Sequence, residues 1–303
     1  MTKKEYLNHE YNLFMEGYVD HTVEFYTNPS IALMDPFKIS DNLYYVGDKK
    51  VCIHLIDTGD GLILVDSGYF GAAHLLVDNI WRAGFDPRDI KLIIHTHGHT
   101  DHYGASDEFR RMYGCKLAIS RVDEEVLKPL REEGRAMHGF FPLSKVPEFD
   151  MLIEDGDVIE MGNTKIRCVL TPGHTAGVIT LFFDTTYEGK TYPVGLYGGA
   201  GVNALTLKYI YSDKNYTSYI GCDRDMLSSI EKIWDEPVVI HLGNHPGNNK
   251  TLEKREKMIK EGGNPFVDPE SWHNFLGTLK DKTKWIIECN DELEQKLDDI
   301  CEK

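Results

Sequence analysis

The chain of 303 residues lacks a long hydrophobic segment. None of its apolar runs is long enough to cross a bilayer, and the first residues alternate acids and bases instead of forming a signal-peptide core. Basic residues are scarce, because 33 Lys and Arg face 49 Asp and Glu. The resulting net charge of −16 would repel a phosphodiester backbone. We therefore expect neither a membrane partner nor a nucleic-acid partner.

Closely spaced cysteine pairs are also missing. The six cysteines include no C-x-x-C pair, and several lie in strand-like apolar runs, which is typical of reduced thiols in a protein core. The hydrophobic content of 41% and charged content of 27% are ordinary for a globular protein. The sequence predicts a cytoplasmic protein that needs no disulfide. We expect one domain over residues 1–303, with a lead-in at 1–40 and helices packed on it at 249–303.

One loop, in contrast, is very rich in histidine. An apolar strand expected at 91–95 runs into four histidines and one aspartate within eight residues. His97 and His99 are two residues apart, so they project to the same side of an extended chain. Asp101 and His102 follow where the chain must leave the strand. Imidazole and carboxylate together suit Zn²⁺ better than Ca²⁺ or Mg²⁺. This loop is predicted to bind metal.

Segments of strand and helix character alternate in both halves of the chain. Strands are expected at 42–47, 51–57, 61–66, 91–95, 116–120, 158–161, 164–170, 178–183, 194–197 and 238–242. Helices are expected at 72–83, 105–113, 122–130, 226–233, 252–261 and 269–301. A similar order in both halves fits an α/β fold in which two sheets pack face to face with helices outside.

Two later histidines also follow apolar strands. His174 lies in a Thr-Pro-Gly-His turn, and His245 begins a His-Pro-Gly turn. With the first loop they complete two sets of three protein ligands, which leaves a coordination position open for water, as in catalytic metal sites. His95 and His241 each lie within a few residues of a predicted ligand. We expect them to end strands without binding metal.

These motifs together resemble the metallo-β-lactamase superfamily. The resemblance implies an αββα four-layer sandwich. It also implies a first metal held by His97, His99 and His174 and a second metal held by Asp101, His102 and His245. Asp66, in the Val-Asp-Ser-Gly turn, resembles an early aspartate of the family that orients the ligand loop.

Further details are similar to the third subclass of zinc β-lactamases. They include the segments 42–47 and 264–269 and the His-Pro-Gly ending. Many two-metal relatives carry a metal-bridging aspartate after a later strand, whereas this chain reads Leu-Tyr-Gly-Gly-Ala-Gly at 196–201. Iron-binding flavo-diiron relatives carry glutamate where this chain has His99. Both differences favour the zinc subclass.

The resemblance implies a zinc-dependent metallohydrolase with two Zn²⁺ per chain and a small-molecule substrate. A metal-bound hydroxide would open an amide or ester, with a β-lactam-type ring as the favoured substrate. Asp101 would be the catalytic residue that orients the nucleophile and shuttles its proton. Two alternatives stay open: an intracellular lactonase or thioesterase acting on a metabolite, and a non-catalytic metal-binding member of the fold.

Two long irregular segments are candidate substrate loops. They are Arg131–Asp150 and Asn203–Gly221, and loops of this length are often functional. The second contains a group of tyrosines, namely Tyr209, Tyr211, Tyr216 and Tyr219. These side chains would either line the substrate pocket or pack against the domain, and the sequence favours neither. It also leaves the oligomeric state open.

Overall fold

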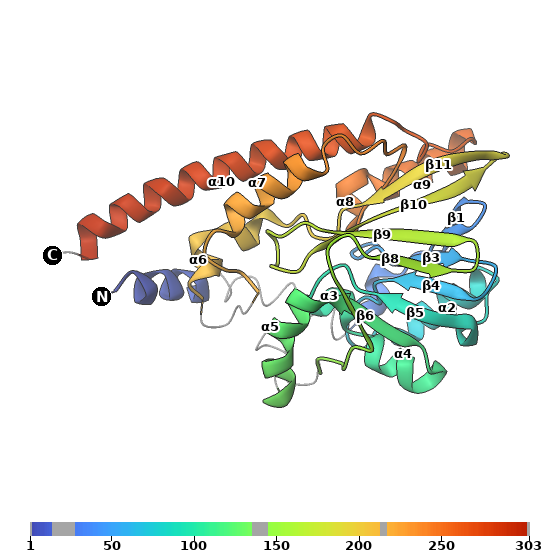
Figure 1. Cartoon of the computed structure of the whole chain (residues 1–303), viewed down its shortest axis with the longest axis horizontal. Coiled ribbons are helices and arrows are strands. Elements are labelled where there is room, and N and C mark those ends of the chain that lie inside the picture. The colour runs from blue at the N-terminus through green and yellow to red at the C-terminus, as the bar shows by residue number, and fades with distance from the viewer. Residues whose placement is uncertain (1, 14–27, 135–144, 213–216, 302–303) are drawn as a thin grey trace.

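Two β-sheets lie face to face between helices (Figure 1). The computed structural model describes residues 2–13, 28–134, 145–212 and 217–301. The two sheets and the helices outside them form the four-layer αββα arrangement that the sequence predicted. In the described residues, no helix combines the length and the apolar character that a membrane span requires.

The first sheet carries the histidine-rich loop. Its strands, in spatial order, are β1 (Phe37–Ser40), β2 (Leu43–Tyr45), β3 (His54–Asp57), β4 (Leu62–Val65), β5 (Ile90–Ile94), β6 (Lys116–Ser120) and β7 (Met151–Ile153). Pairing is antiparallel from β1 to β4 and parallel from β4 to β7. Parallel neighbours need crossover connections. These contain α2 (Ala73–Arg82), η2 (Pro87–Asp89), α3 (Thr100–Tyr103), α4 (Ser106–Tyr113) and α5 (Arg121–Glu132).

The second sheet supplies the other half of the sandwich. Its strands, from one edge to the other, are β12 (Ile240–Leu242), β11 (Lys190–Leu196), β10 (Ile179–Tyr187), β9 (Thr164–Leu170) and β8 (Val158–Met161). Only the β11–β12 pair is parallel among these described strands. The remaining elements are η1 (Pro29–Ala32), η3 (Val202–Leu205), α6 (Leu207–Ile210), α7 (Cys222–Lys232), α8 (Pro246–Asn249), α9 (Thr251–Glu261) and α10 (Ser271–Cys301).

Alternating side chains of the strands explain the layers. In β4, Ile63 and Val65 point into the core between the two sheets, while Leu64 packs outward with Leu76 of α2. Successive residues of a strand face opposite sides, so a strand buried on both faces is a continuous apolar run. On the outer face of the second sheet, strand residues pack against α7 and α10, where Trp272 is fully buried.

The N-terminal 40 residues contain more regular structure than the sequence indicated. Residues 3–13 are helical, and β1 opens the first sheet. Leu7 of this helix packs with Leu207 and Leu297, so its apolar face is buried only by distant segments, which local periodicity does not reveal. Strand β7 was also not predicted, since three residues are too few to show a period.

Candidate metal centre

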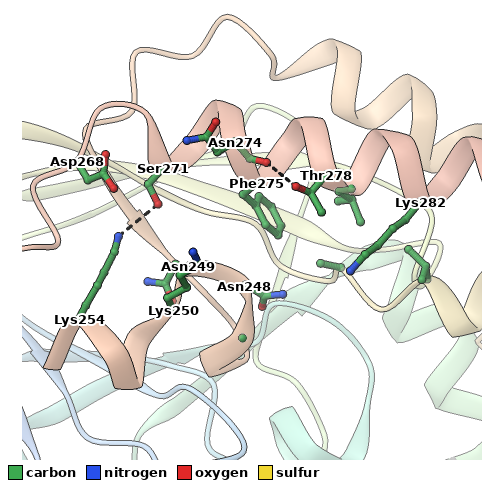
Figure 2. Close-up of a pocket in the computed structure, with 14 residues that line it drawn as sticks. Asn248, Asn249, Lys250, Lys254, Asp268, Ser271, Asn274, Phe275, Thr278 and Lys282 are labelled. Atoms are coloured by element: carbon green, nitrogen blue, oxygen red, sulfur yellow. Dashed lines mark hydrogen bonds between the residues drawn. The ribbon is translucent and has the colours of Figure 1, made fainter. Parts of the chain in front are cut away.

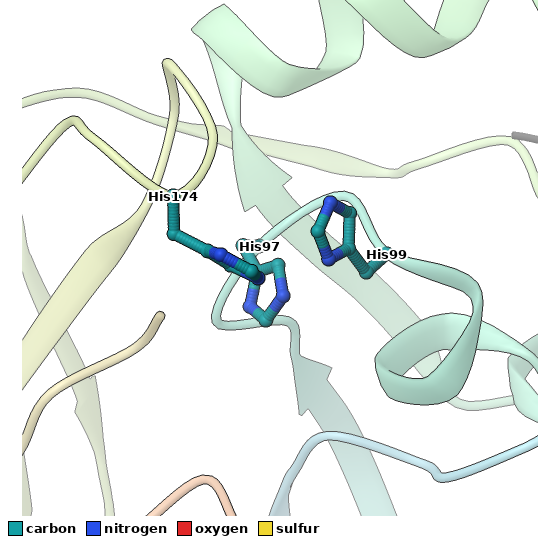
Figure 3. Close-up of side chains that lie close together, drawn as sticks. All are labelled: His97, His99 and His174. Atoms are coloured by element: carbon teal, nitrogen blue, oxygen red, sulfur yellow. The ribbon is translucent and has the colours of Figure 1, made fainter. Parts of the chain in front are cut away.

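Strand ends and the turns that follow them bring the predicted ligands together. Asp66 follows β4, the histidine-rich loop follows β5, and His245 follows β12. His174 lies in the connection between β9 and β10. Figure 3 shows the rings of His97 and His99, from the loop after β5, grouped with the ring of His174 from the opposite sheet.

His97, His99 and His174 form the first cluster. One ligand atom from each lies within 4.8 Å of the others, and the ring centroids are 4.4 to 4.9 Å apart. One nitrogen of His174, Nδ1, bonds the Gly201 carbonyl at 2.7 Å, and Nε2 of His99 bonds the Thr217 hydroxyl at 2.8 Å. In the His174 ring, the bond at Nδ1 leaves Nε2 for the cluster.

The second cluster comprises Asp101, His102 and His245. Oδ2 of Asp101 lies 3.4 Å from Nε2 of His102 and 3.5 Å from Nε2 of His245. The Nδ1 atom of His245 bonds the Lys50 carbonyl at 2.7 Å, which aims Nε2 at the aspartate. The two clusters are adjacent, because the rings of His97 and His102 are 4.1 Å apart.

Two buried nitrogen atoms indicate that these clusters fit metal ions. Among the described residues, Nε2 of His97 and Nε2 of His102 are buried and have no hydrogen-bond partner. A buried polar atom without a partner is costly, and a coordinated ion would satisfy it. Nitrogen and carboxylate oxygen form a donor set that Zn²⁺ accepts. All six predicted ligands therefore lie where two ions could be held.

Asp66 holds the loop that carries most of these ligands. Its carboxylate accepts hydrogen bonds from the Thr96 amide at 2.8 Å and the Thr96 hydroxyl at 2.9 Å. The same group bonds Nδ1 of His102 at 2.7 Å, which leaves Nε2 of that ring facing Asp101. The backbone of Asp66 is left-handed, with φ of 64°, a conformation that aspartate tolerates better than most residues.

The pKa values of His97 and His174 shift in the opposite direction from that of His102. Burial lowers the pKa of His97 well below its ordinary value and that of His174 to about 4, so both rings are neutral. Burial also opposes charge on His102, but Asp101 and Asp66 outweigh it and raise the pKa of His102 to about 10. Burial likewise opposes ionisation of Asp101, yet the charge of His102 keeps its pKa well below the usual range.

Asp123, at the start of α5, is a residue that sequence reasoning missed. Its buried carboxylate accepts hydrogen bonds from the Gly98 amide at 2.6 Å, the Thr175 hydroxyl at 2.8 Å and the Gly177 amide at 2.8 Å. Gly98 lies between two ligands of the first cluster, and Thr175 follows the third. Asp123 therefore ties together the two chain segments that form this cluster. Burial raises its pKa to about 6.

The histidines predicted not to bind metal lie outside both clusters. The ring of His95 is buried and bonds the Ala118 carbonyl at 2.7 Å and the Ser106 hydroxyl at 2.6 Å. His241 lies within β12, where its Nδ1 atom is 3.2 Å from the Ser271 hydroxyl and its ring packs against Phe275.

The tyrosines of 203–221 mainly pack. Tyr209 makes an edge contact with Tyr11, with ring centroids 5.0 Å apart, and Tyr211 packs with the Leu7 group. The hydroxyl of Tyr219 donates to Asp225 at 2.8 Å. Tyr216 lies outside the described residues, as do 135–144 of the other candidate substrate loop.

The backbone of Gly201 lies directly against the ring of His174. A side chain at this position would begin 2.6 Å from Cε1 of His174, so the close approach of the backbone to this ring requires glycine. The carbonyl of the same glycine orients the His174 ring.

Comparison with known proteins shows which family has a similar sequence. The sequence model of the Metallo-beta-lactamase superfamily matches residues 47–187, which include the histidine-rich loop, Asp66 and His174. Residues 47–187 form a metallo-β-lactamase superfamily domain.

Solved structures of the superfamily extend the match to most of the chain. The subclass B3 metallo-beta-lactamase BJP-1 of Bradyrhizobium japonicum is 26% identical, with a TM-score of 0.76 over 86% of this chain and 97% of that one. The class B3 di-zinc metallo-beta-lactamase LRA-12 from an Alaskan soil metagenome is also 26% identical, with a TM-score of 0.70 over 84% and 94%. These likenesses confirm the predicted resemblance to the third subclass.

A relative found by sequence similarity is named as a hydrolase other than a β-lactamase. A hydroxyacylglutathione hydrolase of Chelativorans sp. (strain BNC1) is 32% identical over 108 residues, or 36% of this chain. The chain spans about a third of that relative's length, 34%. Superfamily members similar to this chain thus include hydrolases with different substrates.

Proposed function

We propose that the chain is a zinc-dependent hydrolase that holds two Zn²⁺ ions and opens an amide or ester bond of a small molecule, with a β-lactam-type ring as the favoured substrate. The observation that carries this proposal is the pair of adjacent three-residue clusters, each with a buried imidazole nitrogen that makes no hydrogen bond within the described chain. Similarity to a protein named di-zinc supports the number and kind of ions.

His97, His99 and His174 would hold the first ion, and Asp101, His102 and His245 the second. Zinc ions at these positions would supply Lewis-acid polarisation of a carbonyl and a nucleophile at neutral pH. The protein must keep each ring in one orientation, and the carbonyls of Gly201 and Lys50 and the carboxylate of Asp66 do so.

Asp101 is the proposed catalytic residue. Its side chain is 21% exposed, so its carboxylate meets both the buried ligands and the open side of the site. Because its pKa lies well below the usual range, Asp101 stays ionised, and the carboxylate oxygen that does not hold the ion can accept a hydrogen bond from a water molecule. A weakly basic carboxylate orients an attacking water better than it stores a proton. We therefore assign it orientation first and proton transfer second.

Two alternative functions would use the same metal centre. Similarity to a protein named hydroxyacylglutathione hydrolase favours a lactonase or thioesterase acting on a metabolite. A non-catalytic metal-binding member of the fold would need only the metal ligands, which a hydrolase needs as well.

We also propose a cytoplasmic location. The cysteines Cys52, Cys115, Cys168, Cys222 and Cys289 are free thiols, which supports a reducing compartment.

One experiment separates these functions. Zinc-loaded protein is analysed for metal and tested on a chromogenic cephalosporin, a lactone panel and a thioester panel, with and without chelator. Two zinc ions per chain and chelator-sensitive cephalosporin hydrolysis would support the β-lactamase activity. Turnover of lactones or thioesters alone would favour the metabolite hydrolase. Two ions without any turnover would indicate a binding protein, and one ion or none would contradict the two-metal centre.

A further inference from the structure

A cleft with three lysines opens beside the candidate metal centre. Its volume is about 360 Å³, and it lies between α10 on one side and α8 and α9 on the other (Figure 2). Lys250 joins α8 to α9, Lys254 lies in α9, and Lys282 lies in α10. Among the described lining residues, Asp268 is the only acid. The cleft is therefore positive in a chain whose net charge is −16.

The lysine charges are not neutralised by acids of the described chain. None of the three forms an ion pair there, although Lys254 donates to the Ser271 hydroxyl at 3.3 Å and lies 5.5 Å from the Phe266 ring centre. Burial lowers the pKa of Lys254, and the nearby charge of Lys250 lowers it further, while Asp268 acts against both. An anion between these ammonium groups would relieve their repulsion.

The wall of the cleft is continuous with the metal centre. Gly247 lines the cleft and lies two residues after His245, a span of at most about 7 Å of chain. Ala200 and Val202 also line the cleft, and they flank Gly201, whose carbonyl bonds His174. One molecule could therefore reach from both clusters into the cleft.

We infer that the cleft binds an anionic group of the substrate, a carboxylate or a phosphate, at the end remote from the hydrolysed bond. This inference rests on the proposed hydrolase function, because it places the reacting carbonyl at the metal centre. Lysine suits the task, since an ammonium group is a flexible point charge that binds either anion. The substrate class is then an ester, thioester or amide with an acidic arm long enough to pass Gly247 and enter the cleft.

The test uses thioesters of one acyl group with three leaving thiols: mercaptohexanamide, mercaptohexanoate and mercaptohexyl phosphate. The hexanoate and phosphate arms distinguish the two anions, and the amide is the neutral reference. Zinc-loaded wild type is compared with Lys282→Glu and with Lys250→Ala/Lys282→Ala. Lys284→Glu is the matched control, because this exposed lysine is on the same helix but does not line the cleft.

We expect wild type to prefer an anionic arm over the amide in kcat/KM. The double variant should lose about tenfold of that preference, at roughly threefold per lysine as for exposed charges, and Lys282→Glu should lose at least as much. Lys284→Glu should retain it, and salt should reduce it. Hydrolysis of all three thioesters without a charge preference would overturn the cleft inference alone.

A binding measurement covers the case in which no thioester is hydrolysed, an outcome that would count against the hydrolase. The three free thiols are titrated calorimetrically into zinc-loaded protein. Tighter binding of an anionic thiol in wild type but not in the double variant supports the cleft as an anion site. Equal affinities for all three, or no binding, would overturn it.

Discussion

At the scale of single residues, the candidate centre depends on which nitrogen of each histidine is already engaged. His174 and His245 each bond a backbone carbonyl through Nδ1, and His102 bonds Asp66 through the same atom. The remaining nitrogen of each ring then points into its cluster. Orientation by a second partner distinguishes such a residue from His95, whose two nitrogens are both bonded inside the fold.

Substitution of individual histidines tests this distinction. His174→Ala removes one of three ligands of the first ion, so zinc content should fall and hydrolysis should decrease by two or more orders of magnitude, about the cost of losing metal activation. His245→Ala should lower second-site zinc. His241→Ala should change both far less. Metal content, circular dichroism and turnover are measured together, and loss of zinc in His241→Ala but not in His245→Ala would mean that the wrong histidine was chosen.

The raised pKa of His102 predicts how the second ion binds. Below a pKa of about 10, the ring carries a proton that zinc must displace from Nε2, so affinity of the second site should increase as pH rises toward 10. Burial lowers the pKa of His97 and brings that of His174 to about 4, so these two rings impose no such requirement at neutral pH.

The measurement is zinc titration calorimetry at several pH values, in buffers of different ionisation enthalpy. We expect proton release on binding of the second ion near pH 7. Release that instead accompanies the first ion, or a second-site affinity that falls with rising pH, would contradict this assignment.

At the scale of elements, the first cluster depends on α5, which contributes no ligand. Asp123→Asn keeps the size of the side chain but replaces one acceptor by a donor that faces amide and hydroxyl donors. Each lost charge-assisted bond costs about 1.5–3 kcal/mol, so first-site zinc affinity should fall at least tenfold. Glu125→Gln, an exposed neighbour on the same helix, is the control. Equal zinc affinity in wild type and Asp123→Asn would show that the carboxylate does not position the loops.

The elements also show why the sequence predicted part of the site and not the rest. His97, His99, Asp101 and His102 are adjacent in the chain, so their spacing alone indicates a ligand loop. Asp123 was missed because Ser120 and Asp123 look like an ordinary helix start. The Ser120 hydroxyl does accept a hydrogen bond from the Asp123 amide, as a helix cap would. Only the packing of α5 reveals where its carboxylate points.

The lysine cleft was missed for a related reason. Lys250 and Lys282 are far apart in sequence, and they share a cleft because α10 packs over α8 and α9. Most strands and helices were predicted, since long runs of period 2 or 3.6 need no tertiary information. The short strand β7 and the helix at 3–13 needed contacts that local patterns do not contain.

At the scale of the whole molecule, the state of the cysteines tests the proposed compartment. Cys289 is the only exposed thiol among those the structure describes, whereas burial raises the pKa of Cys115 to about 11 and that of Cys168 to about 12. Native protein should therefore react quickly with a thiol reagent at Cys289, and Cys289→Ser should remove that reaction.

In unfolded protein that is prepared without reductant and shielded from air, all six cysteines should titrate as free thiols. A native disulfide found by mass spectrometry would contradict a reducing compartment. A rapid reaction that survives in Cys289→Ser would instead show that another thiol is reachable in the native fold.

The contact of Leu7 with Leu297 has a consequence for biosynthesis. The two leucines are separated by nearly the whole chain, and both ends of the chain lie at the same side of the molecule (Figure 1). At about 5–20 residues per second, a ribosome needs roughly 15 to 60 s to travel from one to the other. During that interval both sheets and all six proposed ligands are made, while the first helix still lacks the contact with Leu297. The metal centre can thus assemble before the ends of the chain meet, and the terminal helices close last.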